Sequence, residues 1–546
     1  MSASSKKKLR SEQYNAKMTE RQMAEQKEAK KVKLLTTGFV LVLAAIVVVA
    51  AIAGVNQFIS NSGIREKNTV ALTVGDHEIS NAELSYYYMD SINGFFSQYG
   101  SYASLLGLDM SKPLDEQVSN EETGDTWADD FLAQAKDNAA VMYALNDAAA
   151  AAGYTLEESA KTNMENAIGN MQLNAIMYGY GDLETYLKAI YGKGATEEGY
   201  RAYYEMNLLG ESYYDHYAKS LTYDDAAIEA ADQENPQVYS NYSYNYYNLN
   251  TSKFLTGGTT DAEGNTTYSD DEKAAAVAAA KAAAEALTAE NISYVEQFNA
   301  AIAALDVNVG TTGAVSTEVN EAAYDSVLTV AKDWITDPSR QAGDVEMFEN
   351  ASTTTDADGK EVTDIKGYYV VMFNGIQDNE FALKNVRHIL AKFQGGTYDE
   401  ATGMTNYSDD EKAAAKAKAE EILNTWKSGE ATELSFGELA IEKSEDTGSI
   451  PSGGLYENVY PNQMVAEFED WCYDESRIAG DVGIIETSYG YHVMYFVGNS
   501  DVTYRQFMIE SALRSADASA WYVEITDAVE ITDGDTKYID TSVTMN

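Results

Sequence analysis

Hydrophobic and polar positions repeat with different periods in different parts of the chain. Residues 34–58 are almost entirely apolar. The segment VALTVGDHEIS at 70–80 has the composition of two short strands joined by a Gly-Asp turn. From there to about residue 230, apolar residues recur at helical spacing, and Asn81 is expected to cap the first helix. The clearest helical segments are 129–153, 155–173 and 182–192.

The apolar segment is long enough to cross a membrane. No charged residue lies between Leu34 and Ile64, and residues 34–55 would span roughly 33 Å as a helix. A buried core helix should keep a polar face, which this segment lacks. A cleaved signal peptide is the stronger alternative, but the apolar run exceeds a usual signal core. We therefore predict a transmembrane signal-anchor at 34–58.

The residues before this segment set its expected orientation. Residues 1–33 contain ten Lys or Arg and four Glu, a net charge of +6. Positive charge before a span holds that end in the cytoplasm. The sequence thus predicts a cytoplasmic basic tail at 1–33. The bulk of the chain is expected outside the cell membrane, to which one helix attaches it.

An internal repeat occupies the second half of the chain. Tyr268-Ser-Asp-Asp-Glu-Lys-Ala-Ala-Ala recurs from Tyr407, an offset of 139 residues. Asp333-Trp334, Arg340 and Ala342-Gly-Asp-Val recur from Asp470, an offset of 137. Low complexity could imitate the alanine-rich part but not the Trp, Arg and Gly-Asp-Val spacing. Two copies of one domain, at about 240–376 and 384–498, explain these matches.

Each copy has the pattern of a small α+β domain. Ser269 and Ser408 stand three residues before Glu272 and Glu411, which predicts a capping box at the start of a helix. In the second copy a strand over 386–393 precedes this helix, and a strand over 489–497 closes the copy. The expected order is strand, helix, helix, loop, helix, strand. After Val502 the helical pattern resumes, and a very short strand is expected at 529–531.

Charge excludes one class of partner. Residues 34–546 carry 28 basic and 83 acidic residues. Such an acidic body is repelled by polyanions, which argues against nucleic acid. The single cysteine, Cys472, cannot form an intramolecular disulfide. The chain has neither HExxH nor a cysteine cluster, so no metal site and no cofactor is predicted.

Two of the four histidines fall on the terminal strands of the second copy. Alternation places His388 on one strand and His492 on the other, and neighbouring strands would let the imidazoles meet. Asp446 lies in a loop after the second helix, and Met464 and Phe468 are expected on one helix face. A histidine pair, a carboxylate and an apolar pocket suit a small ring flanked by amide carbonyls. Each residue taken alone is more often structural.

These residues resemble the parvulin peptidyl-prolyl isomerases in order and spacing. The resemblance is carried by Val386-Arg-His-Ile-Leu, Ser444-Glu-Asp, Gly453-Gly454, Gln463-Met464, Phe468-Glu469 and Gly490-Tyr-His. It covers about 110 residues. The layout of the whole chain is similar to extracytoplasmic foldases of the SurA and PrsA type. One departure follows Gly453-Gly454, where the family often continues Asp-Leu-Gly and this chain has Leu455-Tyr456-Glu457.

The resemblance implies roles for five residues. His388, Asp446 and His492 would be catalytic, with Asp446 facing the reacting amide. Met464 and Phe468 would bind the proline ring of the substrate. The first copy has Tyr369 in place of His492 and, by alignment on the tryptophans, Val327 and Ala331 in place of the pocket residues. The first copy is therefore expected to keep the fold and lack the activity.

The resemblance also implies a fold class and a function. We expect a multidomain α+β protein with an N-terminal transmembrane helix, a helical chaperone-like domain at 69–239, a degenerate parvulin-like domain at 240–376, an active one at 384–498, and a C-terminal helix at 500–546 packed on the chaperone domain. The expected function is isomerisation of X-Pro bonds in unfolded or partly folded exported polypeptides. A non-catalytic holdase is the alternative, because the helical region is rich in tyrosine. A purely structural surface protein would have neither activity. The oligomeric state stays open.

Overall fold

The structure is a computed structural model that describes residues 4–11, 13, 57, 59, 61–262, 264–289, 292–308, 313–355, 359–399 and 402–544. The predicted span at 34–58 lies outside these residues, apart from Gln57, and so does most of the predicted tail at 1–33. Within the described ranges, no helix is both long and apolar enough to cross a bilayer. The chain divides into two compact units, Met1–Leu221 with Ala516–Asn546 (unit 1) and Thr222–Ser515 (unit 2).

Unit 1 contains a small antiparallel sheet of three strands in the order β15-β1-β2. The predicted strand pair is confirmed as β1 (Val70–Val74) and β2 (His77–Ser80). The third strand is β15 (Ile531–Asp533), two residues later than the pattern suggested. Its position is set by pairing with β1, where Leu72 faces Asp533, and local sequence carries no information on that partner.

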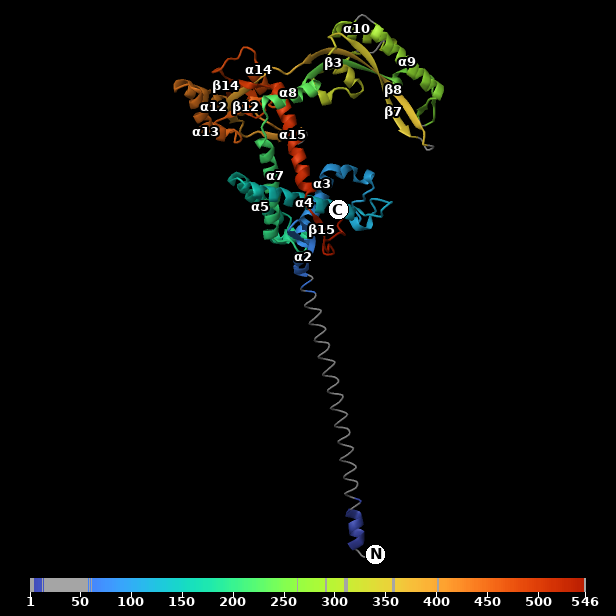
Figure 1. Cartoon of the computed structure of the whole chain (residues 1–546), viewed down its shortest axis with the longest axis vertical. Coiled ribbons are helices and arrows are strands. Elements are labelled where there is room, and N and C mark those ends of the chain that lie inside the picture. Colours follow the sequence, from blue (N-terminus) through green and yellow to red (C-terminus); the bar gives the residue numbers. More distant parts are fainter. Residues whose placement is uncertain are drawn as a thin grey trace. The chain divides into compact units, whose positions relative to one another are not determined.

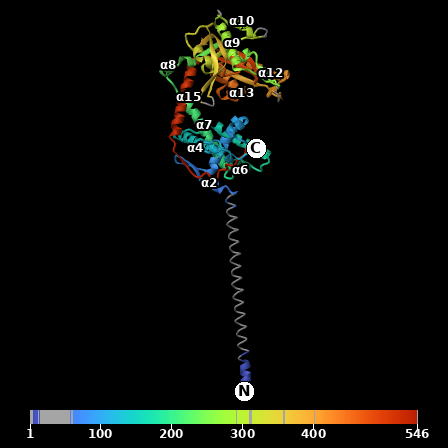
Figure 2. The same ribbon diagram turned by 90° about the vertical axis from the view of Figure 1, so that its right-hand side faces the viewer.

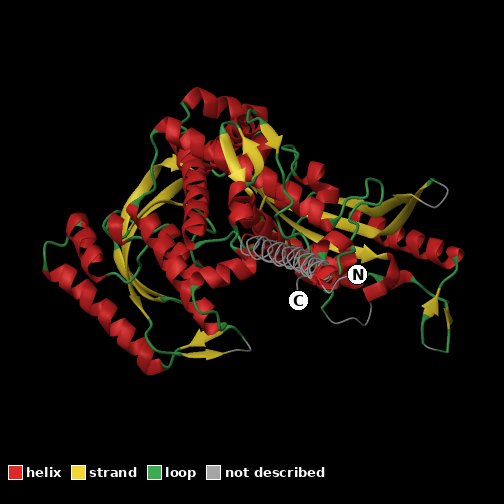
Figure 3. Cartoon of the chain, turned by 90° about the horizontal axis from the view of Figure 1, so that it is seen from below, coloured by secondary structure: helices red, strands yellow, loops and turns green. Residues whose placement is uncertain are grey.

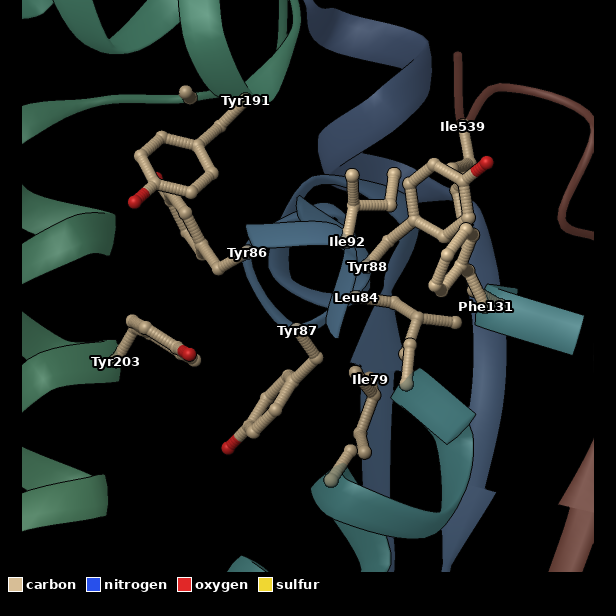
Figure 4. Close-up of a cluster of buried hydrophobic side chains, with 14 of the residues drawn as sticks. Ile79, Leu84, Tyr86, Tyr87, Tyr88, Ile92, Phe131, Tyr191, Tyr203 and Ile539 are labelled. Carbon is tan, nitrogen blue, oxygen red and sulfur yellow. The ribbon is translucent and has the colours of Figure 1, made fainter. Parts of the chain in front are cut away.

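Helices form most of unit 1. They are α2 (Ile64–Asn68), α3 (Asn81–Tyr99), α4 (Trp127–Ala152), α5 (Glu158–Met177), α6 (Leu183–Tyr191) and α7 (Glu197–Ser220). Three consecutive tyrosines of α3 lie in the core and point in different directions (Figure 4). Tyr86 packs on Tyr191 and Tyr203, while Tyr88 lies beside Phe131 and Ile539 (Figure 4). Consecutive residues of a helix diverge by about 100°, so α3 is enclosed on several sides.

The start of α3 corrects one prediction. Ser80, and not Asn81, is the N-cap, and its hydroxyl oxygen accepts a hydrogen bond from the Glu83 N–H. Asn81 is fully buried, and its amide donates to the carbonyl oxygens of Thr69 and Asp535 at 2.9 and 2.7 Å. Asn81 therefore ties the C-terminal segment to the start of α3, a role that the sequence pattern could not reveal.

Unit 2 contains the two copies of the repeat. Copy 1 has a four-stranded sheet in the order β6-β3-β8-β7, and copy 2 has the order β12-β9-β14-β13. The strands of copy 1 are β3 (Asn241–Asn250), β6 (Thr317–Ala323), β7 (Val345–Thr355) and β8 (Glu361–Gln377). Those of copy 2 are β9 (Ala382–Lys392), β12 (Leu455–Val459), β13 (Val482–Thr487) and β14 (Gly490–Thr503). In both copies the first and last strands pair at the centre of the sheet.

A long helix packs on each sheet. The helices of copy 1 are α9 (Asp270–Ala289), α10 (Val295–Ala304) and α11 (Lys332–Ile335), and those of copy 2 are α12 (Asp409–Ser428), α13 (Glu433–Lys443) and α14 (Ala466–Tyr473). Figures 1 and 2 show α9 beside the strands of its copy. Both predicted capping boxes are confirmed, since the Ser269 and Ser408 hydroxyls accept from the Glu272 and Glu411 N–H groups. A short hairpin precedes each long helix, β4–β5 (Thr259–Thr260, Thr266–Thr267) and β10–β11 (Thr397–Asp399, Met404–Asn406), drawn as small arrow pairs in Figure 3.

The expected order of elements in the second copy was incomplete. It lacked β12 and β13, the two edge strands of the sheet. Each has only five or six residues, and neither shows a clear alternation of apolar and polar residues. Pairing with β9 and β14 therefore decides their conformation.

Two further helices complete the described chain. Unit 2 opens with α8 (Asp225–Glu234) before copy 1. After copy 2, the chain passes directly from β14 into α15 (Tyr504–Asp527), which confirms the predicted helix after residue 502.

Candidate active site

The two histidines of copy 2 meet on the central strand pair of its sheet. β9 and β14 run antiparallel, and His388 pairs with Met494 while His492 pairs with Leu390. Residues two apart share a face of a sheet, so this register makes the imidazoles diagonal neighbours. Their Nδ1 atoms are 2.9 Å apart, and the rings are almost parallel with centroids 5.1 Å apart. The expectation that the two strands are neighbours is confirmed.

Asp446 lies at hydrogen-bond distance from His388. It follows α13, and its Oδ2 is 2.8 Å from His388 Nε2. The same oxygen accepts hydrogen bonds from the hydroxyls of Ser449 and Tyr456 at 2.6 and 3.1 Å. The hydrogen bond from His388 is the main reason that the pKa of Asp446 lies well below its usual range. Asp446 is therefore ionised wherever the protein is folded near neutral pH.

His492 is held in its neutral form. Its side chain is buried, and burial, with the nearby His388, lowers its pKa to about 3. On the side away from His388, its Nε2 is 2.8 Å from the hydroxyl of Thr487. The Tyr489 N–H donates to the same hydroxyl oxygen at 3.1 Å. Since that oxygen accepts from the backbone, its proton is free to point at His492.

The hydrogen-bond partners order the protons of this network. Ionised Asp446 can only accept, so His388 donates to it from Nε2. When the Nδ1 of His388 carries no proton, neutral His492 donates to it from its own Nδ1, and the Nε2 of His492 accepts from Thr487. Each imidazole tautomer is thus fixed by the next group in the chain.

A cluster of apolar side chains, called the apolar cup below, lies against the histidines. Phe468, in the first turn of α14, is 3% exposed, and its ring is roughly perpendicular to those of His388 and His492, at centroid distances of 5.5 and 5.8 Å. Met464 is half-buried and packs against the same cluster, whose buried members include Phe468 and Met494. The prediction that Met464 and Phe468 lie on one helix face is wrong, because α14 begins at Ala466 and Met464 lies in the turn before it. The cup still combines both predicted side chains.

Three polar residues of the network were not predicted from the sequence: Ser449, Tyr456 and Thr487. Ser449 follows Asp446 by three residues, a spacing that favours local hydrogen bonds in turns. Thr487 lies at the end of β13, next to the turn into β14. The spacing from Asp446 could have identified Ser449 in the sequence. The positions of Tyr456 and Thr487 at the site depend instead on strand pairing.

Tyr456 reaches the site from an edge strand. β12 pairs with β9 so that Tyr456 lies opposite Val386 and shares the face that carries His388. Its ring centroid is 5.3 Å from His388 and 6.3 Å from Phe468. Burial and the adjacent Asp446 raise the pKa of Tyr456 to about 12, so its hydroxyl stays a proton donor. Tyr456 thus contacts both the polar network and the apolar cup.

Copy 1 has tyrosines at the corresponding positions. Gly367 pairs with Asn250 in copy 1 as Gly490 pairs with Lys392 in copy 2, so Tyr246 and Tyr369 correspond to His388 and His492. Their ring centroids are 5.7 Å apart. Val327 and Ala331, expected opposite the cup residues, are buried in the core beside them. All four histidines of the chain lie outside copy 1.

Across the described ranges, no group of three or more His, Cys, Asp or Glu residues has the geometry to hold a metal ion.

Comparison with known proteins assigns the second copy. Residues 388–498 match the family described as Rotamase: PPIC-type PPIASE domain. Foldase protein PrsA 1 of Listeria monocytogenes is 33% identical over 110 residues, which are 20% of this chain and 34% of that protein. Chaperone SurA of Pseudomonas putida is 35% identical over 91 residues, 16% of this chain and 19% of that protein. The chain thus spans about a third or less of the length of these relatives.

Among solved structures, PrsA from Bacillus subtilis aligns over 78% of this chain and 98% of its own, at 13% identity and a TM-score of 0.27. Peptidylprolyl isomerase PrsA from Bacillus cereus covers 30% of this chain and 57% of its own, at 27% identity and a TM-score of 0.17. The family match over residues 388–498 shows that the chain contains a parvulin-type peptidyl-prolyl isomerase domain there.

Proposed function

We propose that this protein catalyses cis–trans isomerisation of X-Pro bonds in unfolded or partly folded polypeptides outside the cytoplasmic membrane, and so acts as a foldase. The observation that carries the proposal is the hydrogen-bonded pair His388–His492, joined to Asp446 and bordered by Phe468, inside the matched domain. His388, Asp446 and His492 are the proposed catalytic residues. Met464 and Phe468 are the proposed binding residues for the proline ring.

The chemistry needs no covalent step. The barrier to rotation of an amide is about 18–20 kcal/mol, and it comes from conjugation of the nitrogen with the carbonyl group. A catalyst need only bind the twisted amide more tightly than either planar form. Twisting removes negative charge from the carbonyl oxygen. A carboxylate near that oxygen therefore destabilises the planar amide more than the twisted one.

Each proposed residue has a part in this scheme. The apolar cup binds the pyrrolidine ring and excludes water, which strengthens the electrostatic effect of Asp446. The histidine pair holds Asp446 in place through His388 Nε2. Neutral His492 anchors His388 from the other side. In this scheme the histidines are structural parts of the catalytic centre and do not act as nucleophiles.

The remaining assignments follow the same proposal. We infer that residues 34–58 anchor the chain in the cytoplasmic membrane, with residues 1–33 in the cytoplasm. Residues 69–239, with the C-terminal segment 500–546, would bind unfolded clients. Copy 1, at 240–376, would be an inactive relative of the domain at 384–498, because tyrosines replace both histidines. No nucleic acid and no cofactor takes part.

The proposal is tested by proline-limited refolding and by a proline-peptide assay with the full chain. The double variant His388→Ala, His492→Ala should lower kcat/KM about 10- to 100-fold, since a buried network loses its central donors. The matched control is Tyr246→Phe, Tyr369→Phe in copy 1, which should leave kcat/KM within about twofold. Full activity in the histidine double variant would exclude the proposed catalytic centre.

A second function, holding of unfolded clients, is favoured by an apolar surface in unit 1. Four residues at the end of α5 are 56–79% exposed: Leu173, Ile176, Met177 and Tyr178. Neighbouring exposed apolar side chains often mark a binding site. The test is suppression of client aggregation by the histidine double variant, with and without Met177→Ser, Tyr178→Ser. Holding requires that the histidine variant still protects clients and that the serine substitutions weaken protection.

A further inference from the structure

An open pocket of about 510 Å³ lies in copy 2, at the end of the sheet where β9 stops and β13 turns into β14. One wall is formed by the β10–β11 hairpin, by Tyr407 after it and by Lys412 at the start of α12. The other wall is formed by Glu467 on α14 and by Glu486 and Thr487 at the end of β13. This space, called the flanking pocket below, is distinct from the apolar cup.

Two residues of the flanking pocket border the proposed catalytic centre. Thr487 lines the pocket, and its hydroxyl oxygen is 2.8 Å from His492 Nε2. Glu467 directly precedes Phe468, whose ring lies beside both histidines. Consecutive residues of a helix point about 100° apart, so Phe468 is buried while Glu467 is exposed. An extended chain advances about 3.3–3.6 Å per residue, so a neighbour of a proline in the cup is within reach of this pocket.

The flanking pocket carries an excess of negative charge. Lys412 and Glu486 form an ion pair at 3.0 Å, and Glu486 also accepts a hydrogen bond from the Tyr491 hydroxyl at 2.6 Å. Glu467 has no ion-pair partner within the part of the chain that the structure describes. With the adjoining residues included, five acids oppose three bases, a net charge of −2: Asp409, Asp410, Glu411, Glu467 and Glu486 against Lys392, Lys412 and Lys416. The uncompensated charge on the pocket wall is therefore the Glu467 carboxylate.

The other lining residues suit a cationic side chain. Thr405, Asn406 and Ser488 are exposed and uncharged, and each offers an oxygen that accepts hydrogen bonds. Tyr407 is half-buried at the wall and adds an aromatic ring. Ammonium and guanidinium groups only donate hydrogen bonds, and they are attracted to carboxylates and to aromatic rings. An anionic side chain would instead be repelled by Glu467, and the one lysine of the lining is already paired.

Copy 1 keeps the frame of this pocket but lacks the uncompensated carboxylate. The repeat pairs four residues of the frame with identical ones: Phe254 with Phe393, Tyr268 with Tyr407, Lys273 with Lys412, and Glu349 with Glu486. A tyrosine hydroxyl also donates to the glutamate in both copies, in copy 1 from Tyr368 to Glu349 at 3.3 Å. By alignment on the tryptophans, Val330 stands in place of Glu467. Of the two copies, only the one with the histidine pair has this carboxylate, which links Glu467 to the substrate and not to the fold.

We propose that the flanking pocket binds a lysine or arginine side chain adjacent to the isomerised proline, and that Glu467 gives the domain a preference for basic client segments. The inference rests on the proposed function, because it needs the proline ring in the apolar cup. Glu467 determines specificity and takes no part in rotation of the amide. Residues 34–546 carry 28 basic and 83 acidic residues, so the whole molecule attracts basic segments, and Glu467 holds their charge beside the reacting bond.

The experiment uses the full chain in neutral detergent micelles and three peptides that differ only in the residue before the proline, which is Lys, Gln or Glu. A second set varies the residue after the proline. Calorimetry gives the affinity for each peptide, and NMR exchange gives kcat/KM without a coupling protease that would cut at lysine. In one of the two sets, the Lys peptide should bind about threefold more tightly than the Gln peptide, and the Glu peptide about threefold more weakly, as expected of an exposed charge pair. High salt should remove this preference.

Charge reversal at the pocket separates local binding from general attraction. Glu467→Lys should reverse the order of the three affinities, and Glu467→Gln should bring them within about twofold of each other. The charge-matched control is Glu475→Lys, at an exposed residue of the same copy outside the pocket lining, which should leave the order unchanged. Equal affinities of the wild type for all peptides, or an order that Glu467→Lys does not change, would overturn the proposal. Binding is measured apart from turnover, so preferential binding of the Lys peptide without isomerisation would contradict the proposed function and not the pocket.

Discussion

One carboxylate oxygen of Asp446 accepts more hydrogen bonds than the sequence around Asp446 would suggest. His388, Ser449 and Tyr456 all donate to Oδ2, at 2.8, 2.6 and 3.1 Å. Charge-assisted hydrogen bonds of this kind both orient a carboxylate and keep it ionised. Tyr456 is the unusual one of these three donors, because the parvulins that this domain resembles often have leucine at that position. Its hydroxyl gives this chain a third restraint on the proposed catalytic carboxylate.

Removing only the Tyr456 hydroxyl should impair turnover more than binding. In Tyr456→Phe the ring still borders the cup, so KM should stay within about twofold, while kcat falls about tenfold through loss of a hydrogen bond to a charged group. Selective ¹⁵N labelling follows the His388 tautomer directly, because the chain has only four histidines. Tyr398→Phe, at an exposed tyrosine of the β10–β11 hairpin, is the control. Unchanged kcat together with unchanged imidazole signals would remove Tyr456 from the site.

His492 should make the protein less stable in mild acid. Its pKa is about 3 when folded, against about 6.5 for an unperturbed histidine. Between these values the unfolded state binds a proton that the folded state does not, so stability falls as the pH drops below about 6.5. The contribution is at most about 1.4 kcal/mol per pH unit. Urea midpoints at pH 7, 6 and 5 should fall less steeply for His492→Asn than for the wild type, and parallel slopes would contradict this assignment.

At the scale of elements, one glycine lets β12 approach β9. Gly454 has φ 72°, its carbonyl accepts from the His388 N–H at 2.9 Å, and a Cβ there would be 2.2 Å from the His388 carbonyl oxygen. Gly454 directly precedes β12, and two residues later that strand carries Tyr456. The backbone contact at Gly454 therefore determines where the edge strand, and with it Tyr456, can lie.

Gly454→Ala should lower stability and kcat/KM more than the same substitution at a glycine whose added Cβ would contact no other atom. Gly480, in the same copy, also has a positive φ (94°), but a Cβ there would have no atom within 4 Å. Both alanine variants bear the strain of a left-handed residue, about 1–2 kcal/mol. Only Gly454→Ala adds a backbone clash, worth about 1–3 kcal/mol, and only it should lower kcat/KM. Urea unfolding and the peptide assay would refute this if the two variants behaved alike.

At the scale of the molecule, the two copies of unit 2 share a buried junction at Arg505. This residue lies in the first turn of α15, and its guanidinium donates to the carbonyl oxygens of Tyr239, Pro236 and Asp378. Those residues precede copy 1 and connect copy 1 to copy 2. It also pairs with the carboxylate of Asp232 on α8. One side chain thus joins the beginning of copy 1, the linker between the copies and the helix that leaves copy 2.

Arg505→Met should destabilise unit 2 as a whole. Several buried carbonyl groups lose their donor, at a cost of about 3 kcal/mol. Arg201→Met is the matched control, because Arg201 pairs with Glu165 and Glu197 at the surface of unit 1 and such pairs are worth about 1 kcal/mol or less. Calorimetry should show a lower transition for unit 2 only in the Arg505 variant. Equal small shifts in both variants would mean that the junction is not a source of stability.

Features with local causes could be read from the sequence. The repeat, the capping boxes at Ser269 and Ser408 and most helices of unit 1 depend on residues close to each other in the chain. Alternation also placed His388 and His492 on the correct strands, and a family resemblance selected Asp446, Met464 and Phe468. The edge strands β12 and β13 were missed because short strands gain their conformation from their partners.

Tertiary structure decided what joins residues that are far apart in the chain. The sequence could bring His388 and His492 to neighbouring strands, but the register that leaves their Nδ1 atoms 2.9 Å apart belongs to the folded sheet. Tyr456 at Asp446, Asn81 at Asp535 and Arg505 at Tyr239 likewise appear only once the chain has folded. The physical reason is that periodicity records which face of an element a residue occupies. It does not record which distant element will cover that face.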